Sequence, residues 1–505
     1  MNRLARMMAL TLALLCLFTI GAGAAVARLL PPRLALFQLP TIWANGLASP
    51  GTVLRGATGS PSAESRGEAT AAGVSASLDG LIKSGNLGSR TGALVTDLST
   101  GQVLYQLNPT VGLAPASTTK IVTAIAALGA LGPGARFTTK VIMGPGGRAG
   151  GGSGSGGTPG GSGSRSGGAS VVLVGGGDPT LAAGGYPGSD YPQPATLRSL
   201  AAATANALRA KGLSSVRLRY DASLFGGPQV ARGWPALGAA DNYVSSGNFT
   251  PIAGLEVDQG RLTARGKPDD SDDPGNYRPR SLTPSRDAAH AFAVFLRKDG
   301  ITVRGNPSAG GAPGKGAVLA EVRSPPLAEI VQQMLMESNN VIAETLARQV
   351  AIATGRPGTF AGAAAAVMAV AARFNVKGVH LYDGSGLSPM DRISPRALVT
   401  LVGLAAKSGP RSLRPVITGM PVAGFSGTLG PGSFFGPFGL AALGTVRAKT
   451  GNLTHVATLA GVAYTASGQL LAFAFMGNDI SQKLALQPEL TLARLATALA
   501  GCGCG

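Results

Sequence analysis

The stretch Ala114-Pro115-Ala116-Ser117-Thr118-Thr119-Lys120, followed by the apolar run 121–128, decides how the rest of the chain is read. The pattern predicts a loop that turns into a buried helix with Ser117 in the first turn. Lys120 follows three residues later, so both side chains lie on one helix face, one turn apart. A serine hydroxyl is a poor nucleophile unless a base lies beside it, and a neutral lysine can be that base. Ser-x-x-Lys occurs only here in the chain, but so short a motif also arises by chance, and its meaning depends on its companions.

Two further motifs follow Ser117 in a fixed order. Ser338-Asn339-Asn340 lies between the apolar segments 327–336 and 341–350, and Lys449-Thr450-Gly451 ends a predicted strand. Ser-x-x-Lys, Ser-x-Asn and Lys-Thr-Gly, in that order, are the motifs of penicillin-binding, serine-acylating enzymes. Two other Ser-x-Asn triplets are weaker candidates. Ser84-Gly85-Asn86 precedes Ser117, which is the wrong order, and Ser246-Gly247-Asn248 lies in a loop without flanking helices.

The motifs and their surroundings resemble the D-alanyl-D-alanine carboxypeptidase/endopeptidase family, the class C low-molecular-mass penicillin-binding proteins. The resemblance covers roughly residues 78–498, and the ordered set is far more specific than any single motif. The other matching stretches are 175–181, 324–330, 337–344, Asp383-Gly384-Ser385-Gly386-Leu387-Ser388, 421–424, 427–429 and 448–451. Two positions depart from the commoner pattern, because Asn339 stands in place of Asp and Asn452 in place of Thr. Since Asn452 contributes mainly its backbone N–H, activity is expected to survive both departures.

The resemblance implies a fold of the α+β or α/β class. The main element is a penicillin-binding (β-lactamase/transpeptidase-like) domain with a five-stranded antiparallel sheet flanked by helices, plus one or two inserted β-rich domains. The site is expected between the sheet and the helical subdomain, and no metal or organic cofactor is implied. The expected layout is a signal peptide or membrane anchor at 1–27, a disordered linker at 28–75, the first part of the main domain at 76–143, a flexible Gly/Ser-rich insertion at 144–170, the inserted domain or domains at 171–321, the second part of the main domain at 322–498 and a flexible tail at 499–505.

The expected chemistry is acyl transfer at the peptide bond between two D-alanines, with Ser117 as nucleophile and Lys120 as its base. A lysine with an ordinary pKa of about 10.4 would be neutral in only about one molecule in 2,500 at pH 7. Burial and the nearby cation of Lys449 are both expected to lower the pKa of Lys120. Ser338 is expected to relay a proton to the departing D-alanine nitrogen.

The remaining motif residues are expected to bind substrate. Asn340 can hold both Lys120 and the substrate backbone by hydrogen bonds. Lys449 and Thr450, within Lys449-Thr450-Gly451, suit the terminal carboxylate of a peptide or the equivalent acid of a β-lactam antibiotic. The oxyanion would lie on the backbone N–H groups of Ser117 and Asn452.

Charge and the N-terminal segment bear on location and partners. The formal net charge is +19, which favours anionic lipid or anionic cell-wall polymer as surroundings, but no basic run interleaved with aromatics indicates nucleic-acid binding. Arg3 and Arg6 precede an uncharged segment at 7–27, a pattern typical of export, whether the segment is cleaved or stays as an anchor.

Cys502 and Cys504 are too close in sequence for an easy mutual disulfide, so the exported body is expected to fold without one.

Three other classes of protein could share some of these sequence features. A serine β-lactamase shares the three motifs, but compact β-lactamases have far fewer residues between the first and second motifs. A catalytically silent envelope-binding protein would use the inserted domain instead. A Ser-His-Asp hydrolase would need one of the three histidines, and the chain lacks Gly-x-Ser-x-Gly, so His290, His380 and His455 are expected to be structural. The prediction is therefore an exported D-alanyl-D-alanine carboxypeptidase that acts on peptidoglycan stem peptides, and endopeptidase activity on cross-links is left open.

Overall fold

The computed structural model describes residues 67–144, 169–184, 191–262, 279–314, 316–435 and 440–504. All of them belong to one compact unit, residues 65–505. The predicted export segment at 1–27, most of the predicted linker and nearly all of the Gly/Ser-rich tract lie outside the described residues. Within the described residues, no helix has the length and hydropathy to cross a membrane.

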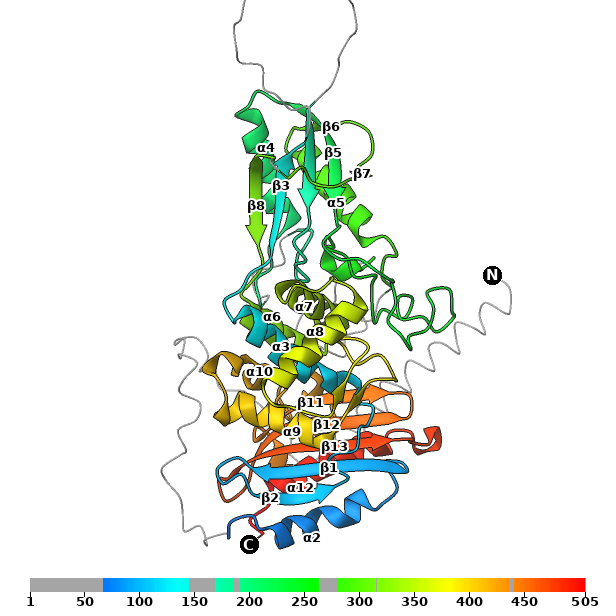
Figure 1. Cartoon of the computed structure of the whole chain (residues 1–505), viewed down its shortest axis with the longest axis vertical. Helices are drawn as coiled ribbons and strands as arrows, with labels where there is room; N and C mark the ends of the chain where they lie inside the picture. Colours follow the sequence, from blue (N-terminus) through cyan, green and yellow to red (C-terminus); the bar gives the residue numbers. More distant parts are fainter. Residues whose placement is uncertain are drawn as a thin grey trace, which may run out of the picture. The chain divides into compact units, whose positions relative to one another are not determined.

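A five-stranded antiparallel sheet joins the two ends of the described chain (Figure 1). Its order is β11-β12-β13-β1-β2, and every neighbouring pair is antiparallel. The strands are β1 (Arg90–Asp97), β2 (Val103–Leu107), β11 (Val446–Leu453), β12 (Val456–Tyr464) and β13 (Leu470–Asn478). Two apolar segments around an Asp/Ser/Gly turn, 92–97 and 102–105, predict the β1–β2 hairpin, and the apolar segments 444–449, 457–465 and 469–476 predict the three C-terminal strands. Asp97 closes the hairpin turn, because its Oδ1 accepts hydrogen bonds from the backbone N–H of Thr100, at 3.0 Å, and of Ser99.

The two faces of this sheet differ in side-chain size. In β13, Leu471, Phe473 and Phe475 point toward α2 (Ala71–Ile82) and α12 (Gln487–Ala500), which pack on each other and cover that face. The alternate residues Ala472, Ala474 and Met476 belong to the core shared with the helices on the opposite face. This alternation follows from the period of two in a strand, and it lets the helices of the opposite face approach closely.

The helical subdomain covers that opposite face. Its helices are α3 (Thr119–Leu131), α6 (Leu327–Met336), α7 (Asn340–Ala353), α8 (Phe360–Arg373), α9 (Pro395–Gly403) and α10 (Pro415–Thr418). Every residue of α3 from Thr119 to Leu128 is buried, so this helix forms the centre of the subdomain. Each fully buried Ile, Leu or Val contributes about 1.5–3 kcal/mol to folding, which explains the uninterrupted apolar run after Lys120. The N-caps of α8 and α9 are residue types that favour helix starts. Thr359 and Ser394 accept hydrogen bonds from backbone N–H groups in the first turns of these helices.

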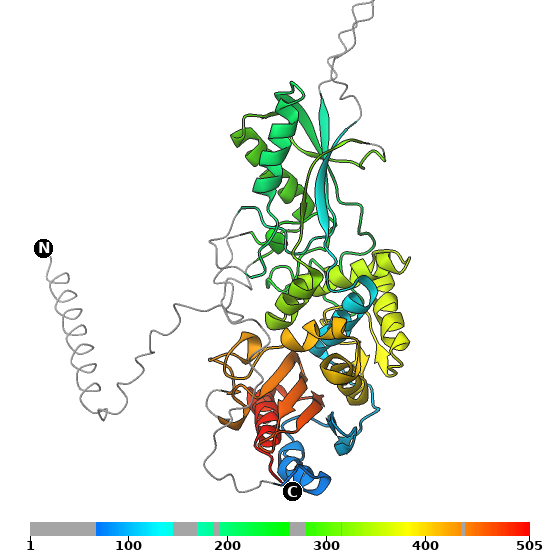
Figure 2. The ribbon, with the colours of Figure 1, turned by 90° about the vertical axis from the view of Figure 1, so that its left-hand side faces the viewer.

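The insertion contains more helix than the expected β-rich domain. Its six-stranded sheet is made of β3 (Thr138–Met143), β4 (Ser170–Val174), β5 (Ser215–Asp221), β6 (Thr302–Val303), β7 (Ser308–Ala309) and β8 (Val318–Arg323). Its helices are α4 (Leu197–Arg209) and α5 (Pro284–Lys298). β4 and β5 are parallel, so the chain needs a crossover between them, and α4 provides it. Both helices pack on the same side of the sheet (Figure 2).

Two domain boundaries differ from the expected layout. β3 pairs with β4 and β8 in the insertion, so the first part of the main domain ends before Thr138 rather than at 143. Ordered structure begins before 75, because Ala69 and Val74 are already buried and Thr70 caps α2. Both segments are short, and the sequence of 138–143 indicates a strand without specifying which strands it pairs with.

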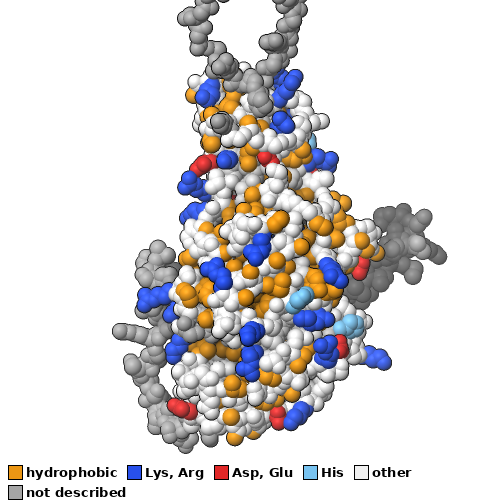
Figure 3. Space-filling view, in the orientation of Figure 1, with side chains coloured by type: hydrophobic (Ala, Val, Ile, Leu, Met, Phe, Trp, Pro, Cys, Tyr) orange, Lys and Arg blue, Asp and Glu red, His pale blue; other side chains and the backbone are white. Residues whose placement is uncertain are grey.

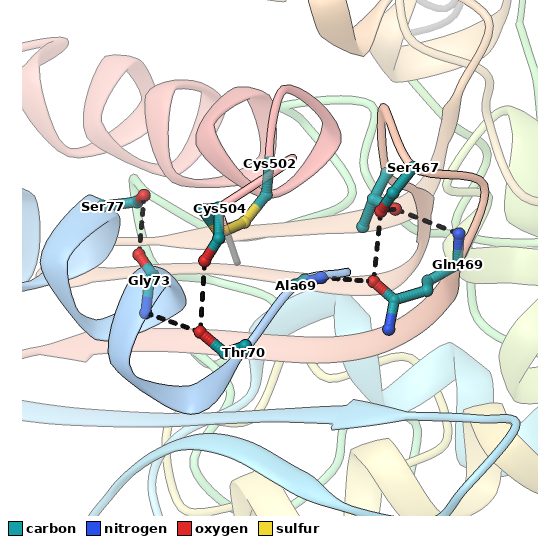
Figure 4. The surroundings of a disulfide bond; sticks show 9 residues. Ala69, Thr70, Gly73, Ser77, Ser467, Gln469, Cys502 and Cys504 are labelled. Atoms are coloured by element: carbon teal, nitrogen blue, oxygen red, sulfur yellow. Dashed lines mark hydrogen bonds between the residues drawn. A yellow bond between two sulfur atoms is a disulfide. The ribbon is translucent and has the colours of Figure 1, made fainter. Parts of the chain in front are cut away.

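The C-terminus is packed rather than a flexible tail. Cys502 is buried in the core beneath α12, and the structure joins it to Cys504 in a disulfide, contrary to the expectation from their spacing. Thr70 Oγ1 donates a hydrogen bond of 3.1 Å to the carbonyl of Cys504, which ties the end of the chain to the start of α2 (Figure 4).

Candidate active site

Ser117 and Lys120 meet at the start of α3. Ser117 lies in the 3-10 turn η2 (Ala116–Thr118), which leads directly into the helix. Lys120 Nζ lies 2.9 Å from Ser117 Oγ, 2.7 Å from Asn340 Oδ1 and 2.8 Å from the carbonyl oxygen of Ser385. The amine therefore faces the serine while two oxygens fix its direction, as a base beside a nucleophile requires.

Burial changes the protonation of Lys120. The side chain is fully buried, and this desolvation lowers its pKa to about 7, against smaller opposing effects of the Asp383 and Glu344 charges. The sequence attributed part of this fall to Lys449. In the structure, burial is the main cause for Lys120, while the pKa of Lys449 is lowered mainly by its own burial and further by repulsion from Lys120. A pKa of about 7 leaves a large neutral fraction at neutral pH.

The Ser338-Asn339-Asn340 triplet forms the turn between α6 and α7. Ser338 has a φ of 55°, in the left-handed region, and Asn339 caps α7 through a 3.0 Å hydrogen bond from the Ile342 N–H. This geometry places Asn340 at the first position of α7, with Oδ1 on Lys120. The turn thus joins the second motif to the first, as the sequence predicted.

The Lys449-Thr450-Gly451 motif lies on β11, the edge strand of the sheet. Lys449 is fully buried and donates a 2.8 Å hydrogen bond to the Thr450 carbonyl. Thr450 Oγ1 donates to Thr428 Oγ1 at 2.9 Å, and Asn452 Nδ2 donates to Glu489 Oε1 at 2.6 Å. Thr450 and Asn452 share a strand face because they are two residues apart.

Gly451 allows β11 to approach the start of α3. A Cβ at this position would lie 2.7 Å from the Pro115 carbonyl oxygen and 3.0 Å from the backbone nitrogen of Ser117. The Thr458 hydroxyl of β12 fixes the same loop by donating a 2.7 Å hydrogen bond to the Pro115 carbonyl. Only glycine leaves enough room for this contact between strand and helix.

The three motifs open into one cavity of about 360 Å³. The residues of the three motifs and of β11 that line it are Ser117, Ser338, Asn339, Asn340, Thr450, Gly451 and Asn452. Lys120 and Lys449 lie buried beneath this surface. The structure therefore brings together every residue that the sequence assigned to the site.

Comparisons with known proteins agree with this arrangement. The family model described as D-Ala-D-Ala carboxypeptidase 3 (S13) matches residues 74–277 and 261–499. The chain belongs to this S13 carboxypeptidase family. A carboxypeptidase of Mycobacterium tuberculosis is 36% identical over 448 residues, which cover 88% of this chain and 87% of that protein. The carboxypeptidase DacB of Mycolicibacterium smegmatis is 35% identical over 446 residues, or 86% of this chain and 85% of that protein.

A solved structure shares the fold of this S13 chain. Penicillin binding protein 4 (dacB) of Haemophilus influenzae superposes with a TM-score of 0.61, at 23% identity, over 83% of this chain and 98% of that one. This likeness supports the arrangement of an antiparallel sheet, a helical subdomain and an insertion.

A loop behind Lys120 supports the site of this S13 chain. The Asp-Gly-Ser-Gly pattern at 383–386 is typical of a turn, and Asp383 shapes it by accepting hydrogen bonds from the backbone N–H groups of Gly386 and Ser388, at 2.7 and 2.6 Å. Glu344 of α7 accepts further bonds from the backbone of Gly384 and Ser385, at 2.7–3.1 Å. These bonds fix the Ser385 carbonyl that holds Lys120.

Sequence reasoning missed two supports of that loop. Glu344 is four residues after Asn340, so both lie on one face of α7, a spacing that could have identified it. Trp234 of the insertion donates from Nε1 to Asp383 Oδ2 at 2.7 Å, and no local pattern indicates this contact across the sequence. Burial raises the pKa of Glu344 to about 8.

The insertion also reaches the cavity directly. Gly247, Asn248, Arg261 and Arg280 line it beside the three motifs. The Asn248 carbonyl accepts a 3.1 Å hydrogen bond from Asn340 Nδ2. The loop 246–248, set aside as a rival Ser-x-Asn motif, thus lies against the triplet that was preferred to it.

Proposed function

We propose that this chain is a serine-type D-alanyl-D-alanine carboxypeptidase that acts on peptidoglycan stem peptides through an acyl-serine intermediate. The observation that carries the proposal is the position of Lys120, whose buried amine lies 2.9 Å from Ser117 Oγ and has a pKa of about 7. A lysine in that state can accept the serine proton without the help of a histidine.

The residues support each step of acylation. Ser117 Oγ attacks the carbonyl of the penultimate D-alanine as Lys120 takes its proton. The backbone N–H groups of Ser117 and Asn452 stabilise the negative oxygen that forms. This role is supported by the close approach of β11 to Ser117, since a Cβ at Gly451 would lie 3.0 Å from the Ser117 nitrogen. The C–N bond then breaks, and Ser338 passes the proton from Lys120 to the nitrogen of the leaving D-alanine. Water, activated by the same lysine, hydrolyses the ester and regenerates Ser117.

A terminal carboxylate is the group by which the site selects its substrate. Burial lowers the pKa of Lys449 well below its usual value, and repulsion from the nearby Lys120 lowers it further. A substrate carboxylate bound by Thr450 and Lys449 places a negative charge beside the Lys449 amine, which stabilises its cationic form and raises the pKa of Lys449 again. The same residues accept the carboxylate of a β-lactam, so β-lactam antibiotics are expected to acylate Ser117. The N-terminal segment 7–27 supports export to the cell envelope, with or without an anchor.

Intact-mass measurement tests the proposal. The full-length protein, incubated with benzylpenicillin, is expected to gain the mass of one antibiotic molecule and to lose it slowly. Ser117→Ala should gain nothing and should release D-alanine from a peptide ending in D-Ala-D-Ala about 10⁴-fold more slowly or worse.

Ser84→Ala is the matched control, because Ser84 begins the other rival triplet, its Oγ donates to the Leu81 carbonyl, and it does not line the cavity. This variant should form the adduct normally. Absence of an adduct on the folded parent would favour the silent binding protein, and rapid loss of the adduct would favour a β-lactamase. Cleavage of a cross-linked peptide dimer measures any endopeptidase activity in the same preparation.

A further inference from the structure

The turn that carries Ser338 is held from two directions. From below, the Asn339 backbone N–H donates a 3.0 Å hydrogen bond to the Met334 carbonyl at the end of α6. From the side, the insertion contacts both asparagines of the triplet. Ser338 itself has a φ of 55°, a conformation that side chains other than glycine rarely adopt, so its surroundings must maintain it.

Asn339 uses its side-chain oxygen and both side-chain N–H groups in this turn. Its Oδ1 caps α7, while Nδ2 donates to Gln259 Oε1 at 2.9 Å and to Glu337 Oε2 at 3.3 Å. An aspartate could cap the helix equally well, but its ionised carboxylate has no proton to donate to either oxygen. The asparagine at this position therefore matches the Gln259 carbonyl of the insertion and the carboxylate of Glu337.

A buried arginine links the two contacts with the insertion. Arg280 is 6% exposed, and it donates from Nε to the Gly247 carbonyl at 3.0 Å and from Nη1 to the Gln259 carbonyl at 2.8 Å. One planar guanidinium thus fixes two parts of the insertion. The first is the loop in which the Asn248 carbonyl accepts a hydrogen bond from Asn340, and the second is the turn in which the Gln259 side chain accepts one from Asn339. Gln259 has a φ of 55° and is 4% exposed, so its own position is well determined.

We propose that Asn248, Gln259 and Arg280 form a clamp by which the insertion positions the Ser338-Asn339-Asn340 turn for acylation, a role that rests on the function proposed above. Asn340 Oδ1 directs Lys120, and Ser338 carries the proton relay, so a displacement of the turn disturbs both at once. Gln259 is a positioning residue, since it acts through Asn339 and does not line the cavity. The insertion is, in this view, part of the catalytic apparatus rather than a separate binding module.

A double-mutant cycle tests the clamp. Gln259→Met removes the acceptor at similar size, and Asn339→Ser removes the donor while keeping a helix cap. Each single variant of the full-length protein is expected to lose about 10- to 100-fold in the rate of acylation by benzylpenicillin, with little change in the affinity of the initial complex. The double variant should lose no more than the worse single one, because both remove the same contact. Gln259→Glu, which keeps an acceptor, should retain more of the rate than Gln259→Met.

Thr204→Val provides the matched control inside the insertion. Thr204 is fully buried in α4, and its hydroxyl donates within the helix to the Leu200 carbonyl. The variant should lower thermal stability without changing the acylation rate. Equal losses of acylation rate in Thr204→Val and Gln259→Met would show that general destabilisation causes the loss, and would overturn the clamp proposal. Strictly additive losses in the cycle of Gln259→Met and Asn339→Ser would overturn it as well.

Hydrogen–deuterium exchange gives a second readout that does not depend on activity. Amides of residues 337–342 should exchange faster in Gln259→Met and remain unchanged in Thr204→Val. If the parent is not acylated at all, the proposed function fails, but exchange still decides whether the clamp holds the turn. Unchanged exchange in Gln259→Met would overturn the clamp even in an active enzyme.

Discussion

Lys120 can act as a base only in its neutral form, and the structure keeps it neutral mainly by excluding water. Two oxygen acceptors remain on the amine, from Asn340 and Ser385, so it is oriented without a carboxylate in direct contact. The nearby charges of Asp383 and Glu344 oppose the fall in pKa, but burial outweighs them. The lysine is therefore held close to the midpoint of its titration at neutral pH.

The rate of acylation should follow this titration. Because the deprotonated amine is the active form, the rate should fall about tenfold for each pH unit below about 7 and level off above it. The measurement is the second-order rate of adduct formation with benzylpenicillin between about pH 5 and pH 9, where the antibiotic carboxylate stays ionised. A flat profile over that range, or a midpoint near the ordinary lysine value, would contradict the assignment of Lys120 as the base.

At the scale of elements, the site depends on how closely β11 lies against the start of α3. Gly451→Ala should slow acylation about 100-fold, because the new Cβ meets the Pro115 carbonyl and the Ser117 nitrogen and separates the two backbone donors. Overpacking of this kind should also cost about 1–3 kcal/mol in the free energy of unfolding. Acylation rates and chemical denaturation measure the two effects.

Gly80→Ala is the control for that substitution, since Gly80 lies in α2 with open space around its Cα. This variant should acylate normally and gain up to about 1 kcal/mol of stability. Acylation of Gly451→Ala at the parent rate would show that the close approach is not needed.

The sequence predicts elements and motifs better than the contacts between them. Periodicity identified β1, β2, β11, β12 and β13, and motif order identified the site, because both signals are local or ordered along the chain. Trp234 and Gln259 were missed because they reach the site from an insertion without any pattern of their own, and Asn248 was considered only as part of a rival Ser-x-Asn motif. β3 was assigned to the wrong domain for the same reason, since a strand's sequence does not specify its partners.

At the scale of the whole molecule, the described unit is built around one sheet whose strands come from both ends of the chain. Lys and Arg side chains are spread over the face in Figure 3, with few Asp or Glu among them, in line with the net charge of +19. Such a positive electrostatic field attracts anionic groups from a distance, including the terminal carboxylate of a peptide.

The insertion is joined to the helical subdomain through α7, where Gln349 donates hydrogen bonds to the carbonyls of Gly176 and Gly177, at 2.8 and 3.1 Å.

The Gly/Ser-rich tract at 145–168 connects two strands that are already paired, and it should be dispensable for catalysis. β3 and β4 are antiparallel neighbours, with Met143 opposite Val171, and the Gly144 N–H donates to the Ser170 carbonyl at 2.8 Å. Replacing 145–168 with Gly-Asn-Gly closes a much shorter loop, which should raise the free energy of unfolding by about 1–2 kcal/mol. Acylation by benzylpenicillin should be unchanged, and a full-length variant with Arg148 and Arg165 replaced by Ser controls for the charge of the tract. A shortened protein that folds normally but acylates slowly would show instead that the tract contributes to the site.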